Sequence, residues 1–106
     1  MQEAEKIAKL IKDQFQPIAA VTDDIVGCLV VELDWGTDRV RFSFDGARCE
    51  RIEACADLKI HLTNLTVLEN LLSGKTNPME AFFAEDLRSE GYIVPTFRFL
   101  MSISAH

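Results

Sequence analysis

Residues 71–83 read Leu-Leu-Ser-Gly-Lys-Thr-Asn-Pro-Met-Glu-Ala-Phe-Phe, a stretch that contains a helix end, a turn and the start of another helix. Gly74 can adopt the left-handed conformation that closes a helix, because it has no side chain to clash. Asn77 can accept a hydrogen bond from the free amides of the next helix, Pro78 has no N–H to leave unpaired, and Glu80 completes a capping box. The stretch therefore predicts one helix ending near residue 73 and a second beginning at Asn77.

The first turns of this second helix carry large apolar side chains, namely Met79, Phe82 and Phe83. Such a cluster on a short helix faces either a hydrophobic core or a ligand cavity. Sequence spacing alone does not separate these two possibilities.

The chain before this stretch begins with one amphipathic helix and continues with strands. Apolar residues recur at helical spacing over residues 2–15, and Pro17 ends that helix. The apolar residues then alternate with polar ones, which predicts a hairpin of residues 29–35 and 40–44 around the turn at Gly36. Residues 47–53 are charged and suit an edge strand, and residues 58–62 form a fourth strand.

The second half of the chain is expected to be mainly helical. Thr63 or Asn64 caps a leucine-rich helix, residues 77–84 form a short helix, residues 87–92 a fifth strand, and Pro95 starts a last helix reaching about Ser104. This order predicts an α+β fold, in which helices cover one face of a five-stranded, largely antiparallel or mixed sheet. We expect a single domain over residues 1–106, with an N-terminal helix in 1–17 and a body in 25–104.

The last helix is apolar on nearly all sides. Only Arg98, Ser102 and Ser104 are clearly polar in it. A helix of this kind must be buried all round or must face another apolar surface. We therefore expect it to have an apolar partner, which is either a ligand or a protein.

Several of these segments together resemble the sterol carrier protein domain. The resemblance rests on Ala-Asp-Leu-Lys-Ile-His-Leu at 56–62, Ser-Gly-Lys-x-Asn-Pro-Met-x-Ala-Phe at 73–82, then Leu87, Gly91 and the apolar C-terminal segment. It covers residues 25–104 in order. It implies a sterol-carrier-like fold and non-enzymatic binding of an acyl chain or sterol between the sheet and the C-terminal helices.

Ten apolar residues are candidates for contact with such a ligand. On pattern alone each of them suits a core, and the resemblance together with the surplus of Phe and Met favours a cavity for those on the last two helices. We expect the face shared by Phe97, Leu100 and Met101 to act as a lid over that cavity. The candidates are Phe42, Phe44, Leu68, Leu72, Met79, Phe82, Phe83, Phe97, Leu100 and Met101.

The chain departs from the family pattern in places that bear on the ligand. Glu85-Asp86-Leu87 stands where relatives usually have Gly-Lys-Leu. Two carboxylates near the cavity would repel an anionic headgroup, so a neutral or weakly polar ligand is expected. The C-terminal Ser-Ala-His also differs from the peroxisomal Ser-Lys-Leu of many eukaryotic relatives, which favours a bacterial stand-alone protein.

Composition excludes several classes of function. The 106 residues carry a net charge of −6 without a basic cluster, so nucleic acid is not an expected partner. No stretch is long and apolar enough for a membrane span or resembles an export signal, so we expect a cytoplasmic protein without stable membrane insertion. Three cysteines without Cys-x-x-Cys spacing predict free thiols, and no metal or cofactor is expected.

No catalytic constellation is evident in the sequence. His61 falls on the polar face of a strand and His106 is the last residue, and neither is accompanied by a nucleophile motif. Cys28 suits a buried strand position, whereas Cys49 and Cys55 flank the charged strand and could be exposed. We therefore expect no enzymatic activity.

Two functions remain open at this point. The first is binding or transfer of a fatty acyl chain, an isoprenoid or quinone, or a sterol-like molecule in a hydrophobic tunnel, with a role in quinone synthesis as one version. The second is an interaction module, in which the last helix packs against another protein or in a homodimer without any ligand.

Overall fold

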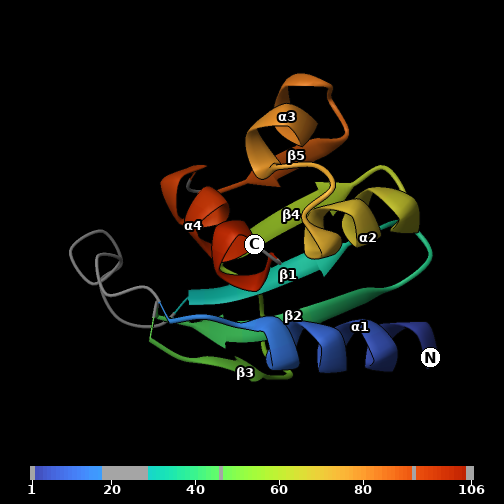
Figure 1. The fold of residues 1–106 in the computed structure, drawn as a ribbon. Coiled ribbons are helices and arrows are strands. Elements are labelled where there is room, and N and C mark those ends of the chain that lie inside the picture. Colours follow the sequence, from blue (N-terminus) through green and yellow to red (C-terminus); the bar gives the residue numbers. More distant parts are fainter. Residues whose placement is uncertain (1, 18–28, 46, 92, 105–106) are drawn as a thin grey trace.

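The computed structural model describes residues 2–17, 29–45, 47–91 and 93–104, and it consists of four helices and one five-stranded sheet (Figure 1). The elements are α1 (Gln2–Gln14), β1 (Leu29–Asp34), β2 (Arg39–Phe44), β3 (Cys49–Arg51), β4 (Leu58–Leu62), α2 (Leu65–Ser73), α3 (Pro78–Phe83), β5 (Leu87–Glu90) and α4 (Ile93–Ile103).

The sheet is mixed and has the strand order β3-β2-β1-β4-β5. β1 pairs parallel with β4, while the other neighbours are antiparallel. Leu33 in the central strand lies opposite Val40 on one side and Ile60 on the other. The predicted α+β class with a mixed sheet is confirmed, and the charged segment predicted at 47–53 does form an edge strand, although only three of its residues pair.

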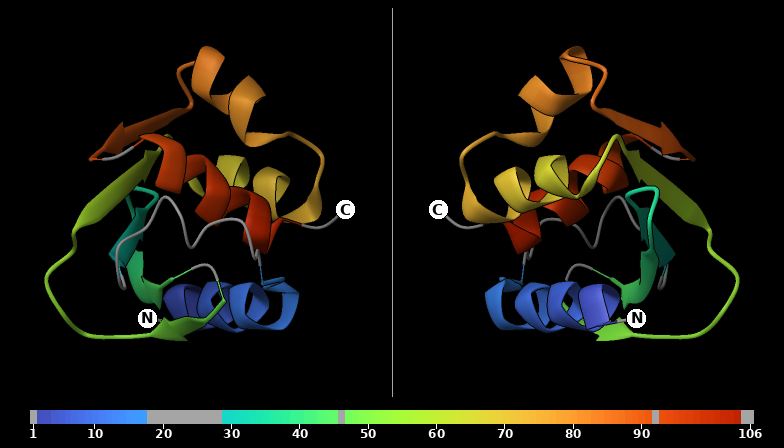
Figure 2. Two further views of the ribbon diagram at one scale, coloured as in Figure 1. Left: turned by 90° about the vertical axis from the view of Figure 1, so that its left-hand side faces the viewer. Right: turned by 90° about the vertical axis from the view of Figure 1, so that its right-hand side faces the viewer.

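All four helices lie on the same face of the sheet (Figure 2). α1 covers β2 and β3, α2 packs on β4, α3 packs beside β5, and α4 contacts both α1 and α3. The strand residues that face these helices are the alternating apolar ones, such as Val31, Leu33, Phe42 and Ile60, and they are buried. The two-residue period of the sequence thus indicated correctly which face of the sheet carries the core.

The turn at residues 74–77 has the caps that the sequence predicts. Gly74 has φ 84° and closes α2, with its N–H donating to the carbonyl of Leu71. The side chain of Asn77 accepts from the amide of Glu80 at 2.8 Å, and the Glu80 carboxylate accepts from the amide of Asn77 at 3.2 Å. This capping box fixes the start of α3 and hence the position of Phe82 and Phe83 beside the sheet edge.

Gln14 joins the C-terminal ends of three helices. Its Nε2 donates to the carbonyls of Leu72 in α2 at 2.9 Å and of Ile103 in α4 at 2.7 Å. The last carbonyls of a helix have no partner within the helix, so one amide at the end of α1 satisfies two of them. These bonds fix the C-terminal end of α4 against the rest of the domain.

The last helix begins earlier than the sequence predicts. α4 starts at Ile93, not at Pro95. Proline is tolerated here because the first four N–H groups of a helix have no partner within it, so a missing N–H in the first turn costs no hydrogen bond. Ile93 and Val94 consequently belong to the helix.

The polar and apolar faces of α4 are also not where residue type would place them. Ser102 and Ser104 are buried, and their hydroxyls donate to the carbonyls of Phe99 at 2.6 Å and Leu100 at 2.7 Å. Because serine can satisfy its hydroxyl on the preceding turn, it enters an apolar core without an unpaired polar group. The exposed side of α4 is instead occupied by apolar residues.

Candidate functional site: an apolar surface on α3 and α4

Three phenylalanines bring α3 and α4 together at the surface. The ring of Phe82 lies 5.5 Å from that of Phe97 and 5.9 Å from that of Phe83, measured between centroids, and both pairs are edge-to-face. Phe82 and Phe97 are half-buried, whereas Phe83 projects outward. The edge-to-face arrangement is one that aromatic rings favour, so this cluster holds α3 against α4.

Around this cluster, large apolar side chains are open to solvent. Phe83 is 75% exposed, and Met79, Ile93, Val94 and Met101 are each between 48% and 53% exposed. Among the described residues, the one other large hydrophobic that is exposed is Leu10 on α1. Together the seven side chains form what we call the α3–α4 apolar surface, comprising Met79, Phe82, Phe83, Ile93, Val94, Phe97 and Met101. Exposed apolar side chains in this number on two neighbouring helices of a small domain often mark a binding site.

An open pocket of about 490 Å³ adjoins this surface. Leu62, Phe82 and Leu87 contribute apolar lining, and the polar lining comes from His61, Thr63, Glu85, Asp86 and Arg88. Phe82 therefore belongs to both the pocket and the α3–α4 apolar surface. The arrangement offers an apolar site with a polar border, which is the usual composition of a site for an amphiphilic molecule.

The turn between α3 and β5 brings the two carboxylates to the pocket. Glu85 has φ 63°, in the left-handed region that favours glycine. Asp86 is fixed through its backbone, because its amide donates to the carbonyl of Ala81 and its carbonyl accepts from the amide of Thr63 at 3.0 Å. Position 85, where the resemblance to sterol carrier domains predicts a glycine, thus has a backbone conformation suited to glycine, and here it holds a charged side chain.

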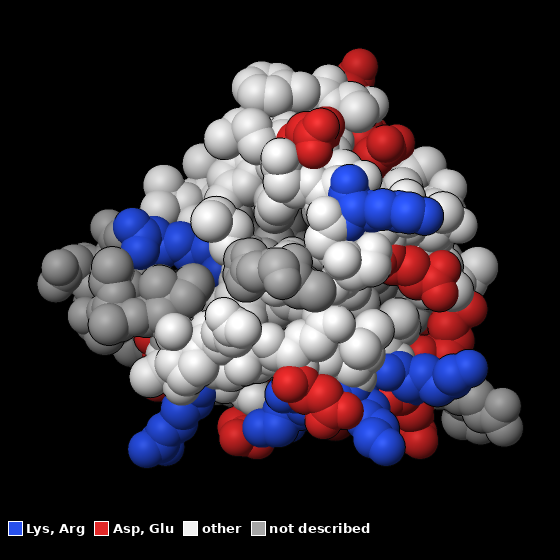
Figure 3. Space-filling view, viewed as in Figure 1, with Lys and Arg blue, Asp and Glu red and all other residues white. Residues whose placement is uncertain are grey.

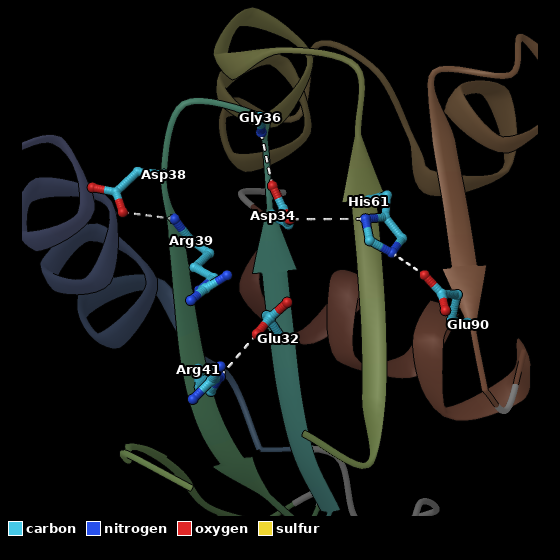
Figure 4. A network of polar contacts seen from close by, with 8 residues as sticks. All are labelled: Glu32, Asp34, Gly36, Asp38, Arg39, Arg41, His61 and Glu90. Carbon is cyan, nitrogen blue, oxygen red and sulfur yellow. Dashed lines mark hydrogen bonds and ion pairs between the residues drawn. The ribbon is translucent and has the colours of Figure 1, made fainter. Parts of the chain in front are cut away.

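The opposite face of the sheet carries a network of charged side chains (Figure 4). His61 on β4 lies between two carboxylates: its Nε2 contacts Glu90 of β5, and its Nδ1 is 3.9 Å from Asp34 of β1. Arg41 Nε donates to Glu32 at 2.8 Å, and that carboxylate is almost fully buried. Each histidine contact is made to a carboxylate, and the network links neighbouring strands across the sheet.

The structure divides the ten predicted ligand residues into two groups. Five are fully buried in the core between sheet and helices, namely Phe42, Phe44, Leu68, Leu72 and Leu100. The other five lie together on the α3–α4 apolar surface, namely Met79, Phe82, Phe83, Phe97 and Met101. Contact of any of them with a ligand stays a prediction.

The face expected to form a lid is split in the structure. Leu100 has no exposed surface, while Met101, the next residue, is about half exposed. Phe97 is half-buried against Phe82. Phe97 and Met101, four residues apart, therefore point to the surface side of α4, and Leu100 points into the core.

Ile93 and Val94 were not among the sequence candidates, although they extend the same surface. They were missed because the helix was expected to begin at Pro95. One signal was available: Ile93 precedes Phe97 by four residues, and Phe97 precedes Met101 by four. This spacing continues one apolar stripe along the whole of α4.

No protein-family model and no curated protein matches this chain. Solved structures do match it. It superimposes on a structure titled UbiJ-SCP2 ubiquinone synthesis protein with a TM-score of 0.67 and 14% identity, covering 96% of this chain and 93% of that one. The chain has the sterol-carrier fold.

Two further similar structures show the same fold in different settings. A solution structure of a palmitated sterol carrier protein 2-like protein from Aedes aegypti matches with a TM-score of 0.57 and 15% identity over 96% of this chain and 95% of that one. A double mutant of the sec-alkyl sulfatase PisA1, an enzyme from Pseudomonas sp., matches with a TM-score of 0.64 and 16% identity over 96% of this chain. The sterol-carrier fold of this chain spans 16% of that enzyme's length.

The cysteines of this sterol-carrier fold differ sharply in their surroundings. Cys49 and Cys55 are both free thiols, whereas Cys28 lies outside the described residues. Cys49, which the sequence suggested could be exposed, is buried, and burial raises the pKa of its thiol from 9.0 to about 12. Cys55 is exposed.

We expect iodoacetamide at about pH 8 to alkylate Cys55 at least about tenfold faster than Cys49, because the thiolate is the nucleophile and access is required. Mass-spectrometric peptide mapping of the folded protein measures both rates, and urea-unfolded protein, in which they should converge, is the control. Equal rates in the folded protein would contradict the burial of Cys49. Because the folded pKa exceeds the unfolded value of 9.0, the stability that Cys49 contributes is complete below that pH and declines as the pH rises towards about 12.

Proposed function

We propose that this protein binds an apolar, lipid-like molecule without transforming it chemically, and that the ligand lies against the α3–α4 apolar surface with its polar end in the adjoining pocket. The observation that carries the proposal is the aromatic cluster of Phe82, Phe83 and Phe97, in which Phe83 is open to solvent and Phe82 lines that pocket. A soluble domain rarely leaves such a cluster exposed unless something covers it.

The fold supports this proposal and suggests the class of ligand. A similar structure of this fold is described as palmitated, and another as a ubiquinone synthesis protein. Fatty acyl chains and isoprenoid or quinone molecules are therefore the candidates to test first. Fatty acyl chains and isoprenoid tails are both long, flexible and apolar, so either could lie along the α3–α4 apolar surface.

The energetics are sufficient for reversible binding. Burying a chain of about sixteen carbons at about 0.8 kcal/mol per methylene gains roughly 12 kcal/mol before the ordering costs of association. A pocket of about 490 Å³ falls within the range usual for small-molecule sites. Affinity in the micromolar range is the expected result.

The polar border of the pocket favours an uncharged headgroup. Glu85 and Asp86 both line it, and Arg88 is the one arginine or lysine in its lining. Two carboxylates outweigh one guanidinium, so a carboxylate or phosphate on the ligand gains less there than a hydroxyl or carbonyl does. We propose an alcohol, ester or quinone headgroup in preference to a free fatty acid.

A displacement assay on delipidated protein tests this function. We expect a bound fluorescent fatty-acid analogue to be displaced at micromolar concentrations by hexadecanol, a methyl ester or a short-chain quinone, and less well by palmitate. Phe83→Asp should weaken probe binding by about tenfold or more, because it removes an apolar contact and adds a charge. Leu10→Asp, which changes an exposed leucine on α1, is the matched control and should leave binding unchanged.

The alternative function predicts a different outcome of the same experiment. If no lipid, quinone or ester competes up to its solubility limit while light scattering shows a dimer, the chain is an interaction module. Bound lipid recovered by organic extraction and identified by mass spectrometry from freshly purified protein would support the proposal independently.

A further inference from the structure

The α3–α4 apolar surface is larger than one bound chain in the pocket needs, and most of its exposed side chains lie outside the pocket lining. Met79, Phe83, Ile93, Val94 and Met101 are all exposed, and none of them lines the pocket. They belong to two helices, α3 and α4, that contact each other. Their function is therefore a separate question from that of the pocket.

The exposed apolar area of this surface does not by itself identify the partner. The five exposed side chains together leave open roughly 500 Å², since one large side chain has about 150–250 Å². A stable protein interface buries about 800 Å² on each partner, and a little over half of that area is apolar, so a second protein chain is kept as an outcome of the test below. A lipid bilayer does not require a surface of matching shape, and a patch of a few side chains is enough for reversible adsorption.

The charges around the surface indicate what kind of bilayer it suits. Figure 3 shows the face over α3 and α4 as largely uncharged, with acidic groups on its α3 side and basic groups at its edges. Glu80 and Glu85 are exposed, Asp86 is half-buried, and the chain has a net charge of −6. The net negative charge disfavours anionic lipid, so zwitterionic or uncharged lipid is favoured.

The surface is also continuous with the pocket through Phe82, which lines the pocket and contacts both Phe83 and Phe97. We infer that the α3–α4 apolar surface docks reversibly on the interface of a zwitterionic lipid bilayer, with Phe83 inserted among the lipids. Docked in this way, the surface brings Phe82, which also lines the pocket, close to the bilayer, and an apolar ligand has a short path between the two. The structure contains no membrane-spanning candidate among its described helices.

This inference rests on the proposed function, but the test separates the two. Trp35 is buried and serves as a constant background, so a second tryptophan can report on one surface position. The variant is Phe83→Trp, and the matched control is Leu10→Trp, at the exposed leucine of α1. Each full-length protein, delipidated, is mixed with phosphatidylcholine vesicles that contain brominated acyl chains, which quench only tryptophan in contact with them.

We expect the vesicles to quench the fluorescence of the tryptophan introduced by Phe83→Trp and to shift its emission to shorter wavelength. The fluorescence of the tryptophan introduced by Leu10→Trp should not change. Adding about 30 mol% phosphatidylglycerol should weaken binding at least about threefold, since the chain has a net charge of −6. The double change Met79→Glu with Met101→Glu, in the Phe83→Trp background, should abolish the quenching. Circular dichroism checks that this variant folds.

Three results would overturn the inference. Equal quenching at the two positions would mean that the protein adsorbs without a preferred face. Stronger binding to anionic vesicles would contradict the role given to the net negative charge. A blue shift of the Phe83→Trp variant without vesicles, increasing with protein concentration, would assign the surface to a second copy of the chain. If the fluorescent fatty-acid analogue or an uncharged lipid binds in solution while vesicles do not quench, the docking inference alone fails. If neither the fatty-acid analogue nor hexadecanol, the methyl ester or the quinone binds, the proposed function fails.

Discussion

Replacing Leu100 by alanine is expected to lower the free energy of unfolding by about 2–5 kcal/mol, while the ligand affinity of the molecules that remain folded stays unchanged. Leu100 has no exposed surface and is part of the core between sheet and helices. Removing its side chain leaves a cavity that the surrounding close-packed residues can fill only in part. Urea unfolding gives the stability, and titration with the fluorescent fatty-acid analogue gives the affinity.

The neighbouring residue provides the matched control. Met101 is about half exposed on the α3–α4 apolar surface, so Met101→Ala should change stability by less than about 0.5 kcal/mol and should weaken ligand binding instead. Two adjacent positions on one helix would then affect two different properties. A small stability loss for Leu100→Ala together with altered affinity would instead place Leu100 against the ligand, as the lid hypothesis from the sequence has it.

Phe99→Ala should destabilise the protein by about 3–5 kcal/mol, which is a large fraction of the roughly 5–15 kcal/mol by which small domains are stable. The Phe99 ring is fully buried, with its centroid 5.1 Å from that of Phe44 in an edge-to-face pair and 6.3 Å from that of Phe42. Its truncation removes contacts to two strands at once. Phe99→Leu, which keeps apolar volume, should lose less and remain folded for measurement.

Phe83→Ala is the control for Phe99→Ala, because it removes the same phenyl ring from an exposed position instead of a buried one. Phe83 is 75% exposed, so its loss should change stability by less than about 0.5 kcal/mol. Its expected effect is a weaker affinity for the fluorescent fatty-acid analogue, which is measured on the same samples. If Phe83→Ala proved as destabilising as Phe99→Ala, Phe83 would have to be buried in solution, and the α3–α4 apolar surface would not be available for binding.

Local chemistry determined much of this protein directly from its sequence. The caps at Gly74 and Asn77, the sheet faces of the first hairpin and the edge position of the charged strand are set by residues close in sequence. Such features depend on backbone conformation and on hydrogen bonds over a few residues, which are similar in any fold. The resemblance carried by residues 56–62 and 73–82 predicted the sterol-carrier fold, and the similar solved structures confirm that prediction.

The allocation of apolar residues between core and surface was decided by the tertiary structure. Helical spacing groups Phe97 with Met101, but it does not say which side of α4 the sheet, α1 and α3 will cover. The structure buries Leu100 and Ser102 and leaves Ile93 and Met101 exposed, although three of these four are apolar. Serine can enter the core because its hydroxyl is satisfied on its own helix. Burial is thus set by the arrangement of segments far apart in sequence, whereas residue type sets only what each position can tolerate.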